Sequence, residues 1–172
     1  MAWLFAILLA GSLVYCALMV AAAWSYLAQK SASGDGGPIS VLKPLSGLDE
    51  GLESNLRSFF EQGYSRFEIL CAVRDRDDPA ARVVEDLQRE FPLVDSRLII
   101  TGEPPYANAK VFSLTRMLAV ARHDLVVMSD SDIRVRPGTL ASIAAEFADP
   151  DIALATCPYR AIAGRSVWSA LE

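Results

Sequence analysis

The sequence predicts an N-terminal transmembrane helix followed by an α/β domain built on a Rossmann-like, mostly parallel sheet. No charged residue precedes Lys30, so every charge of this 172-residue chain lies in the later part. From Ile39 onward, short apolar runs alternate with helical patterns, which is typical of βαβ units. The apolar runs are nearly continuous, as expected for strands that helices cover on both faces. With 52% hydrophobic and 22% charged residues, the chain is neither disordered nor of low complexity.

The first apolar run extends from Ala2 to Ala28 and contains no charged residue. About 20 helical residues cross a hydrocarbon core of about 30 Å, so this run is long enough to span a membrane. Trp3 and Trp24 lie near its ends, where aromatic rings favour the membrane interface. A secretory signal peptide and a buried core helix are the alternatives. The lack of a positively charged start and the length of the run favour a membrane anchor.

Composition divides the chain into three segments. We expect a single-pass anchor over 1–29, a linker over 30–38 and a folded domain over 39–172. The linker contains the stretch SASGDGGP, whose small and polar residues are typical of a flexible boundary. Lys30 follows the helix and nothing basic precedes it, which predicts a cytoplasmic location for the domain.

Five apolar runs predict the strands. The run FEILCAV is apolar at nearly every position, as a strand buried on both faces should be. The first, third, fourth and fifth runs (ISVLK, RLIIT, DLVVMS and IALAT) are similar but shorter or less uniform. Strands are therefore expected over 39–43, 67–73, 97–101, 124–129 and 152–156.

Helical patterns fill the intervals between these runs. In the second of them, Asp78 is suited to cap a helix that has Pro79 at its first position. Apolar residues recur at helical spacing and are expected to face the core: Phe59, Phe60, Leu87, Phe91, Phe112, Leu114, Met117 and Leu118. Helices are expected over 51–61, 79–91, 109–121 and 137–147.

Several functions are disfavoured by what the sequence contains. A net charge of −5 and the absence of any basic run argue against nucleic-acid binding. Neither the dinucleotide-binding pattern G-x-G-x-x-G nor a phosphate-binding P-loop occurs. Cys16, Cys71 and Cys157 are not spaced for zinc or for a disulfide framework, and we expect them to be buried apolar residues. His123, the one histidine, precedes a strand and is expected to be structural, which disfavours histidine-based catalysis.

Acidic clusters follow two of the predicted strands. Asp75 and Asp78 lie in the segment RDRDDP after the second strand, and Asp130 and Asp132 follow the fourth. Ligands of parallel α/β sheets bind beyond the carboxyl ends of the strands. Carboxylates at such an edge suit Mg²⁺ or Mn²⁺, which can bridge the phosphates of a nucleotide. Capping by Asp78 and ordinary loop roles for the other aspartates are the structural alternatives.

Lys110 lies where the third helix of this domain is expected to begin. It is either a solvated surface lysine or a contact to phosphate near the strand ends. Spacing alone leaves both open.

Four segments together resemble a known family. These are VLKPLSGLDEGLESNLRSFF, EILCAVRDRDDPA, NAKVFSL and MSDSDIRV. From about Ile39 to its end, the chain resembles the membrane-anchored ceramide glucosyltransferases, which are glycosyltransferases of the GT-A type. The run LVVMSDSDI also resembles the phosphatase motif of haloacid-dehalogenase-like proteins. That class has the motif on its first strand, whereas here it is on the fourth.

The resemblance implies a UDP-sugar donor, usually UDP-glucose, a divalent cation (Mn²⁺ or Mg²⁺) and transfer with inversion to a lipid hydroxyl. The acceptor would be ceramide or another lipid alcohol. The family's first aspartate matches Asp78, with Asp75 in the same loop a candidate contact to uracil or ribose. Its second matches Asp130, and Asp132 completes a D-x-D that would hold the metal. The lysine of its N-x-K segment matches Lys110, near the nucleotide.

The chain departs from the family pattern at its end. The third aspartate, expected to be the general base, and the Q/R-x-x-R-W motif do not occur before Glu172. We therefore expect the N-terminal, donor-binding portion of such an enzyme, with no catalytic base of its own. The alternative is a membrane-anchored module that binds nucleotide sugars, or an inactive remnant without transferase activity.

Overall fold

The computed structural model describes residues 2–28 and 36–160. The chain forms two compact units, Met1–Ala32 and Ser33–Glu172, and each is described by itself. Most of the predicted linker lies outside the described residues.

The first unit contains the helix α1 (Ala2–Ala28). Its stretch from Trp3 to Ala28 is long and apolar enough to cross a membrane, and its side chains are exposed on every face. A helix that is apolar all round needs an apolar environment, either a protein core or a bilayer. None of its most apolar stretch is buried within the described residues.

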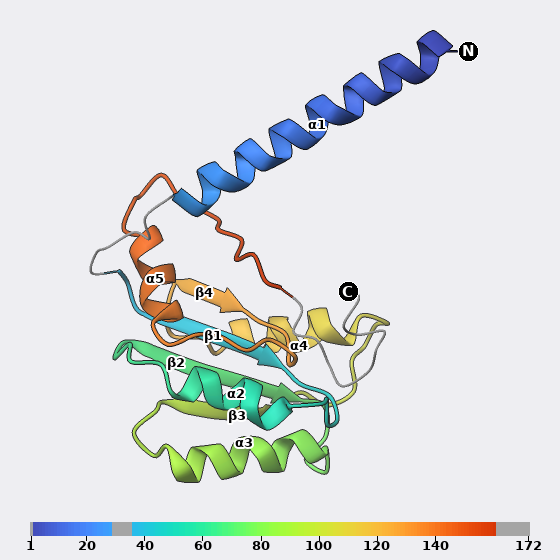
Figure 1. Ribbon diagram of the computed structural model, residues 1–172. Helices are drawn as coiled ribbons and strands as arrows, with labels where there is room; N and C mark the ends of the chain where they lie inside the picture. Colours follow the sequence, from blue (N-terminus) through green and yellow to red (C-terminus); the bar gives the residue numbers. More distant parts are fainter. Residues whose placement is uncertain (1, 29–35, 161–172) are drawn as a thin grey trace. The chain divides into compact units, whose positions relative to one another are not determined.

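The second unit is built on a four-stranded parallel sheet (Figure 1). Its strands are β1 (Ile39–Pro44), β2 (Phe67–Val73), β3 (Ser96–Ile100) and β4 (Leu125–Met128). The order across the sheet is β3-β2-β1-β4. The chain thus adds β2 and β3 on one side of β1 and then returns to place β4 on the other. The predicted parallel α/β sheet is confirmed, and the first four strands begin and end within one residue of the expected positions.

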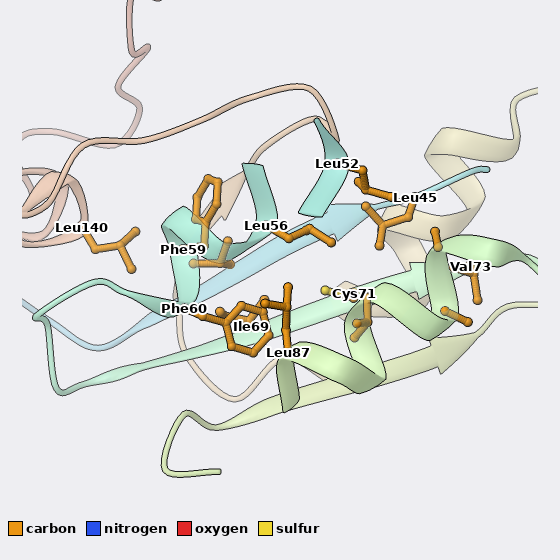
Figure 2. Packing of buried hydrophobic residues seen from close by; sticks show 14 of the residues in the cluster. Leu45, Leu52, Leu56, Phe59, Phe60, Ile69, Cys71, Val73, Leu87 and Leu140 are labelled. Atoms are coloured by element: carbon orange, nitrogen blue, oxygen red, sulfur yellow. The ribbon is translucent and has the colours of Figure 1, made fainter. Parts of the chain in front are cut away.

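Helices cover both faces of the sheet. The helices α2 (Leu52–Phe60), α3 (Pro79–Glu90) and α5 (Thr139–Glu146) contribute to the larger apolar cluster on one face. Figure 2 shows Leu56, Phe60, Ile69 and Leu87 gathered in this cluster. On the other face, α4 (Ala109–Leu118) packs Met117 against Leu42, Leu70 and Ala72.

Three sequence-based expectations are wrong. The segment 152–156 is irregular, and Leu154 is 82% exposed. A strand needs a neighbour for its backbone hydrogen bonds, and this segment pairs with none of the described strands. Leu118 is exposed because the face of α4 that meets the sheet is the one carrying Met117. Of the three cysteines expected to be buried, Cys71 is buried, whereas Cys16 on α1 and Cys157 in the same irregular region are exposed.

A buried carboxylate links the strands at their amino ends. Glu68 on β2 is fully buried and accepts a 2.6 Å hydrogen bond from Ser40 Oγ on β1. It accepts a second 2.6 Å bond from Arg97 on β3. It also accepts from the backbone N–H of Arg122 at 2.7 Å and from its Nε at 3.1 Å, just before β4. The backbone N–H of His123 completes the arrangement by donating to Ser40 Oγ at 3.2 Å.

Glu68 should stabilise the fold in a pH-dependent way. Burial alone would raise its pKa, but the hydrogen bonds from Ser40, Arg122 and Arg97 lower the pKa to about 2. Relative to an ordinary value of 4.5, this contribution is complete above about pH 4.5 and is lost as the pH falls towards 2. We expect Glu68→Gln to lose on the order of 2 to 3 kcal/mol at pH 7 in urea unfolding and to show a flatter acid limb. Equal acid dependence in both proteins would contradict this role.

Candidate functional site

The carboxyl ends of β1 and β4 lie side by side at the point where the strand order reverses (Figure 1). Such a switch point is where open α/β sheets bind ligands, because the loops that follow the two strands diverge. Ser129 extends the ladder by one bond, its N–H donating to Leu42 O at 3.1 Å. The chain then turns through 130–132, and the N–H of Ile133 donates to Asp130 O at 3.3 Å. Asp130 and Asp132 therefore lie at this edge of the sheet, directly after β4.

Lys110 and Asp130 are brought together although 20 positions separate them in the sequence. Lys110 lies in the first turn of α4, whose N-cap Asn108 accepts a 3.0 Å bond from the N–H of Val111. The Lys110 Nζ lies 2.6 Å from Asp130 Oδ1. Their side chains are 55% and 56% exposed, so both groups remain accessible to a ligand from solvent. An ion pair this exposed contributes little to stability.

Asp78 joins two of the loops at the same edge. It caps α3, its Oδ1 accepting from the N–H of Ala80 at 2.9 Å, as expected from the sequence. Both carboxylate oxygens also lie 3.1 Å from the N–H of Gly47, in the loop after β1. Gly47 has φ +67°, a conformation that favours glycine. Asp75 is exposed in the same loop as Asp78, 3.5 Å from Arg74 Nε, and no described contact links it to Asp130.

Polar side chains of α2 and the residues after it hold the segment that follows the D-x-D. Asn55 donates to Ser131 O at 3.3 Å and accepts from Arg134 Nε at 3.2 Å. Ser58 Oγ accepts from the N–H of Val135 at 3.1 Å. Gln62, just beyond the helix, donates to Arg136 O at 2.9 Å and accepts from the N–H of Leu140 at 3.2 Å.

The prediction from sequence missed this polar stripe. Its signal is the presence of Asn55, Ser58 and Gln62 at helical spacing on the side of α2 that otherwise buries apolar residues.

Lys43 on β1 is the second residue that the prediction missed. It is fully buried, with its Nζ 4.3 Å from the centroid of the Phe59 ring. The Nζ donates to the main-chain oxygen of Asp130 and lies 3.2 Å from Ser129 Oγ. Burial lowers the pKa of Lys43 to about 8, while the nearby Cys71, Asp130 and Asp132 act in the opposite direction. Its signal in the sequence is a single charge inside an apolar strand.

The acidic side chains at this edge suit only one kind of metal site. Asp130 and Asp132 are exposed carboxylates, and no group of three or more His, Cys, Asp or Glu side chains gathers within residues 2–28 and 36–160. A structural metal needs a nearly complete set of protein ligands, as in zinc sites. Mg²⁺, by contrast, is bound by one or two carboxylates together with substrate phosphates and water. The two aspartates fit a cation of this second kind.

Comparison with known proteins gives a family and a fold. The family described as Glycosyl transferase family 21 matches residues 4–172. The chain is 37% identical to Ceramide glucosyltransferase 1 of Caenorhabditis elegans over 62% of its own length and 23% of that protein. It is 35% identical to the Ceramide glucosyltransferase of Komagataella phaffii over 59% of its own length and 21% of that protein. The chain thus spans about a fifth to a quarter of these relatives.

A solved structure has the same fold. The mannosyltransferase PcManGT from Pyrobaculum calidifontis, in complex with GDP-Man and Mn²⁺, superposes with a TM-score of 0.61 at 21% identity. The match covers 78% of this chain and 40% of that protein. The predicted GT-A architecture is confirmed by this likeness.

Asp78 accepts hydrogen bonds from the N–H groups of Ala80 and Gly47, so substitutions that keep or remove an acceptor oxygen should differ in stability. We expect Asp78→Ala to lower the free energy of unfolding by about 1 to 2 kcal/mol, since it leaves the N–H groups of Ala80 and Gly47 without their acceptor. Asn caps a helix as well as Asp does, so Asp78→Asn should lose less than half as much. Urea unfolding of the three proteins measures both values. Equal losses in the two variants would show that the capping oxygen does not account for the contribution of Asp78 to the free energy of unfolding.

Proposed function

Since the chain belongs to glycosyl transferase family 21, we propose that it supplies the donor-binding portion of an enzyme that transfers a hexose, expected to be glucose, from a UDP-sugar to a membrane lipid hydroxyl with inversion. The observation that carries this proposal is the ion pair of Lys110 with Asp130 at the switch point of the sheet, two residues before Asp132. Two relatives that are named ceramide glucosyltransferases support the choice of sugar and acceptor class. Ceramide or another lipid alcohol would accept the sugar.

Each residue of the site has a defined task in this proposal. Asp130 and Asp132 would hold a divalent cation, Mn²⁺ or Mg²⁺, and Lys110 would contact the donor phosphates beside it. When bound, this cation would neutralise charge on the diphosphate leaving group. Asp78 keeps the loops after β1 and β2 together through Gly47, so it would shape the wall of the nucleotide pocket. Asp75, exposed in the same region, would face uracil or ribose.

The helix α1 provides the reason for a lipid acceptor. It is long and apolar enough to cross a membrane, and a domain tethered by it would meet lipid hydroxyls at the bilayer surface. We propose the anchor over 1–29, the linker over 30–38 and the transferase portion over 39–172. Lys30 after the helix supports a cytoplasmic domain.

Donor titration tests the site. We expect UDP-glucose with Mn²⁺ to bind the detergent-solubilised chain saturably in calorimetry, and Asp130→Ala or Asp132→Ala to weaken binding at least tenfold, about 1.4 kcal/mol. The control is Asp124→Ala, an exposed aspartate just before the amino end of β4, which should bind like the parent. Equal binding by all variants would remove the D-x-D from the proposal. Radiolabelled transfer to ceramide vesicles separates a transferase from a module that only binds.

Lys110 should matter for binding and not for stability. We expect Lys110→Gln to weaken UDP-glucose binding about fivefold, on the order of 1 kcal/mol, because one charge facing the phosphates is lost. Its thermal midpoint should stay within about 2 °C of the parent, since the exposed pair with Asp130 contributes little to stability. Unchanged affinity for UDP-glucose would show that Lys110 is a solvated surface lysine that does not contact the donor.

A further inference from the structure

Lys43 places a positive charge in the core, in contact with the backbone of the D-x-D segment. Among the described residues, Lys43 and Glu68 are the fully buried charged side chains. Ile39 and Val41, on the same side of β1 as Lys43, belong to the apolar cluster with Phe59 of α2. The lysine stem therefore packs in this cluster, and its buried ammonium lies beside the end of β4.

The contacts of the ammonium are directed at the backbone of the D-x-D segment. Lys43 Nζ donates to the main-chain oxygen of Asp130 and contacts Ser129 Oγ at 3.2 Å. The carboxylate of Asp130 is left to face Lys110, at 2.6 Å. Asp130 thus has two cationic partners: Lys43 binds its main-chain oxygen from the core, and Lys110 binds its side chain at the surface.

We propose that Lys43 is a positioning residue of the donor site, which fixes the peptide at Asp130 and so sets where the carboxylates of Asp130 and Asp132 lie for the metal-bound donor. This inference rests on the proposed donor site. It extends that site to a strand residue that touches neither donor nor metal. Lys43 acts from the core through the peptide of Asp130.

The physical argument separates positioning from simple stabilisation. Transferring an ammonium from water to a protein core carries a large desolvation penalty, and the ammonium of Lys43 has a peptide oxygen, a hydroxyl and the Phe59 ring as its close partners. A methionine at position 43 would fill the space against Phe59 without that penalty. The specific gain from lysine is therefore the hydrogen bonding at Asp130 and a positive charge beneath two carboxylates that otherwise repel each other.

Two substitutions of Lys43 should have opposite effects. Lys43→Met removes the donors and keeps the volume, so its thermal midpoint should equal or exceed that of the parent while affinity for UDP-glucose with Mn²⁺ falls at least tenfold. Lys43→Arg keeps charge and donors but overpacks the core. Its midpoint should fall while its affinity at a temperature where it is folded stays within about threefold of the parent. The control is Met117→Leu, a buried substitution on the opposite face, whose affinity should not change.

Hydrogen exchange tests positioning without any donor. In the full chain, amide exchange over 129–133 should accelerate at least tenfold in Lys43→Met and stay near the parent rate in Lys43→Arg. The proposal would be overturned if Lys43→Met left amide exchange over 129–133 unchanged. It would also be overturned if the affinity for UDP-glucose simply fell and rose with the thermal midpoint in both variants. If the parent protein binds no UDP-glucose, the proposed donor site fails, while the exchange rates still decide whether Lys43 positions the segment.

Discussion

The register of the parallel sheet is the constraint on which the remaining structure depends, and Glu68 holds it at the amino ends of the strands. Side chains alternate between the faces of a strand, so a slip of one residue would exchange the two faces of β1. Glu68 contacts β1, β3 and the residues just before β4 through directional bonds. These bonds are incompatible with any other alignment. A buried carboxylate without such partners would instead destabilise the fold.

The same register determines what lies at the opposite edge. It places Lys43 among the apolar residues facing α2 and puts the end of β4 beside the end of β1. Because the chain returns past β1 to form β4, the strand order reverses between these two strands, which is where sheets of this kind bind ligands. The Asp78 bond to Gly47 and the α2 contacts to residues 131–140 then limit how these loops can lie.

The electrostatics of this edge follow from positive groups placed around two carboxylates. Lys43 lies beneath the peptide of Asp130 and Lys110 lies beside its side chain. Asp130 and Asp132 are both exposed to solvent, as the proposed cation site requires. In the proposed site, a cation and Lys110 would in this way offset the charge of an anionic donor without a basic surface patch.

The sequence by itself determined most of the helices and strands of the described residues. Continuous apolar runs fixed the first four strands, Asp78-Pro79 fixed the start of α3, and the order of acidic segments indicated the family. The strand order, the pairing of Lys110 with Asp130 and the roles of Lys43, Asn55 and Gln62 were decided by tertiary structure. These features depend on which segments meet in space, and local periodicity carries no information about such contacts. For the same reason, the apolar run 152–156 looked like a strand although none of the described strands pairs with it.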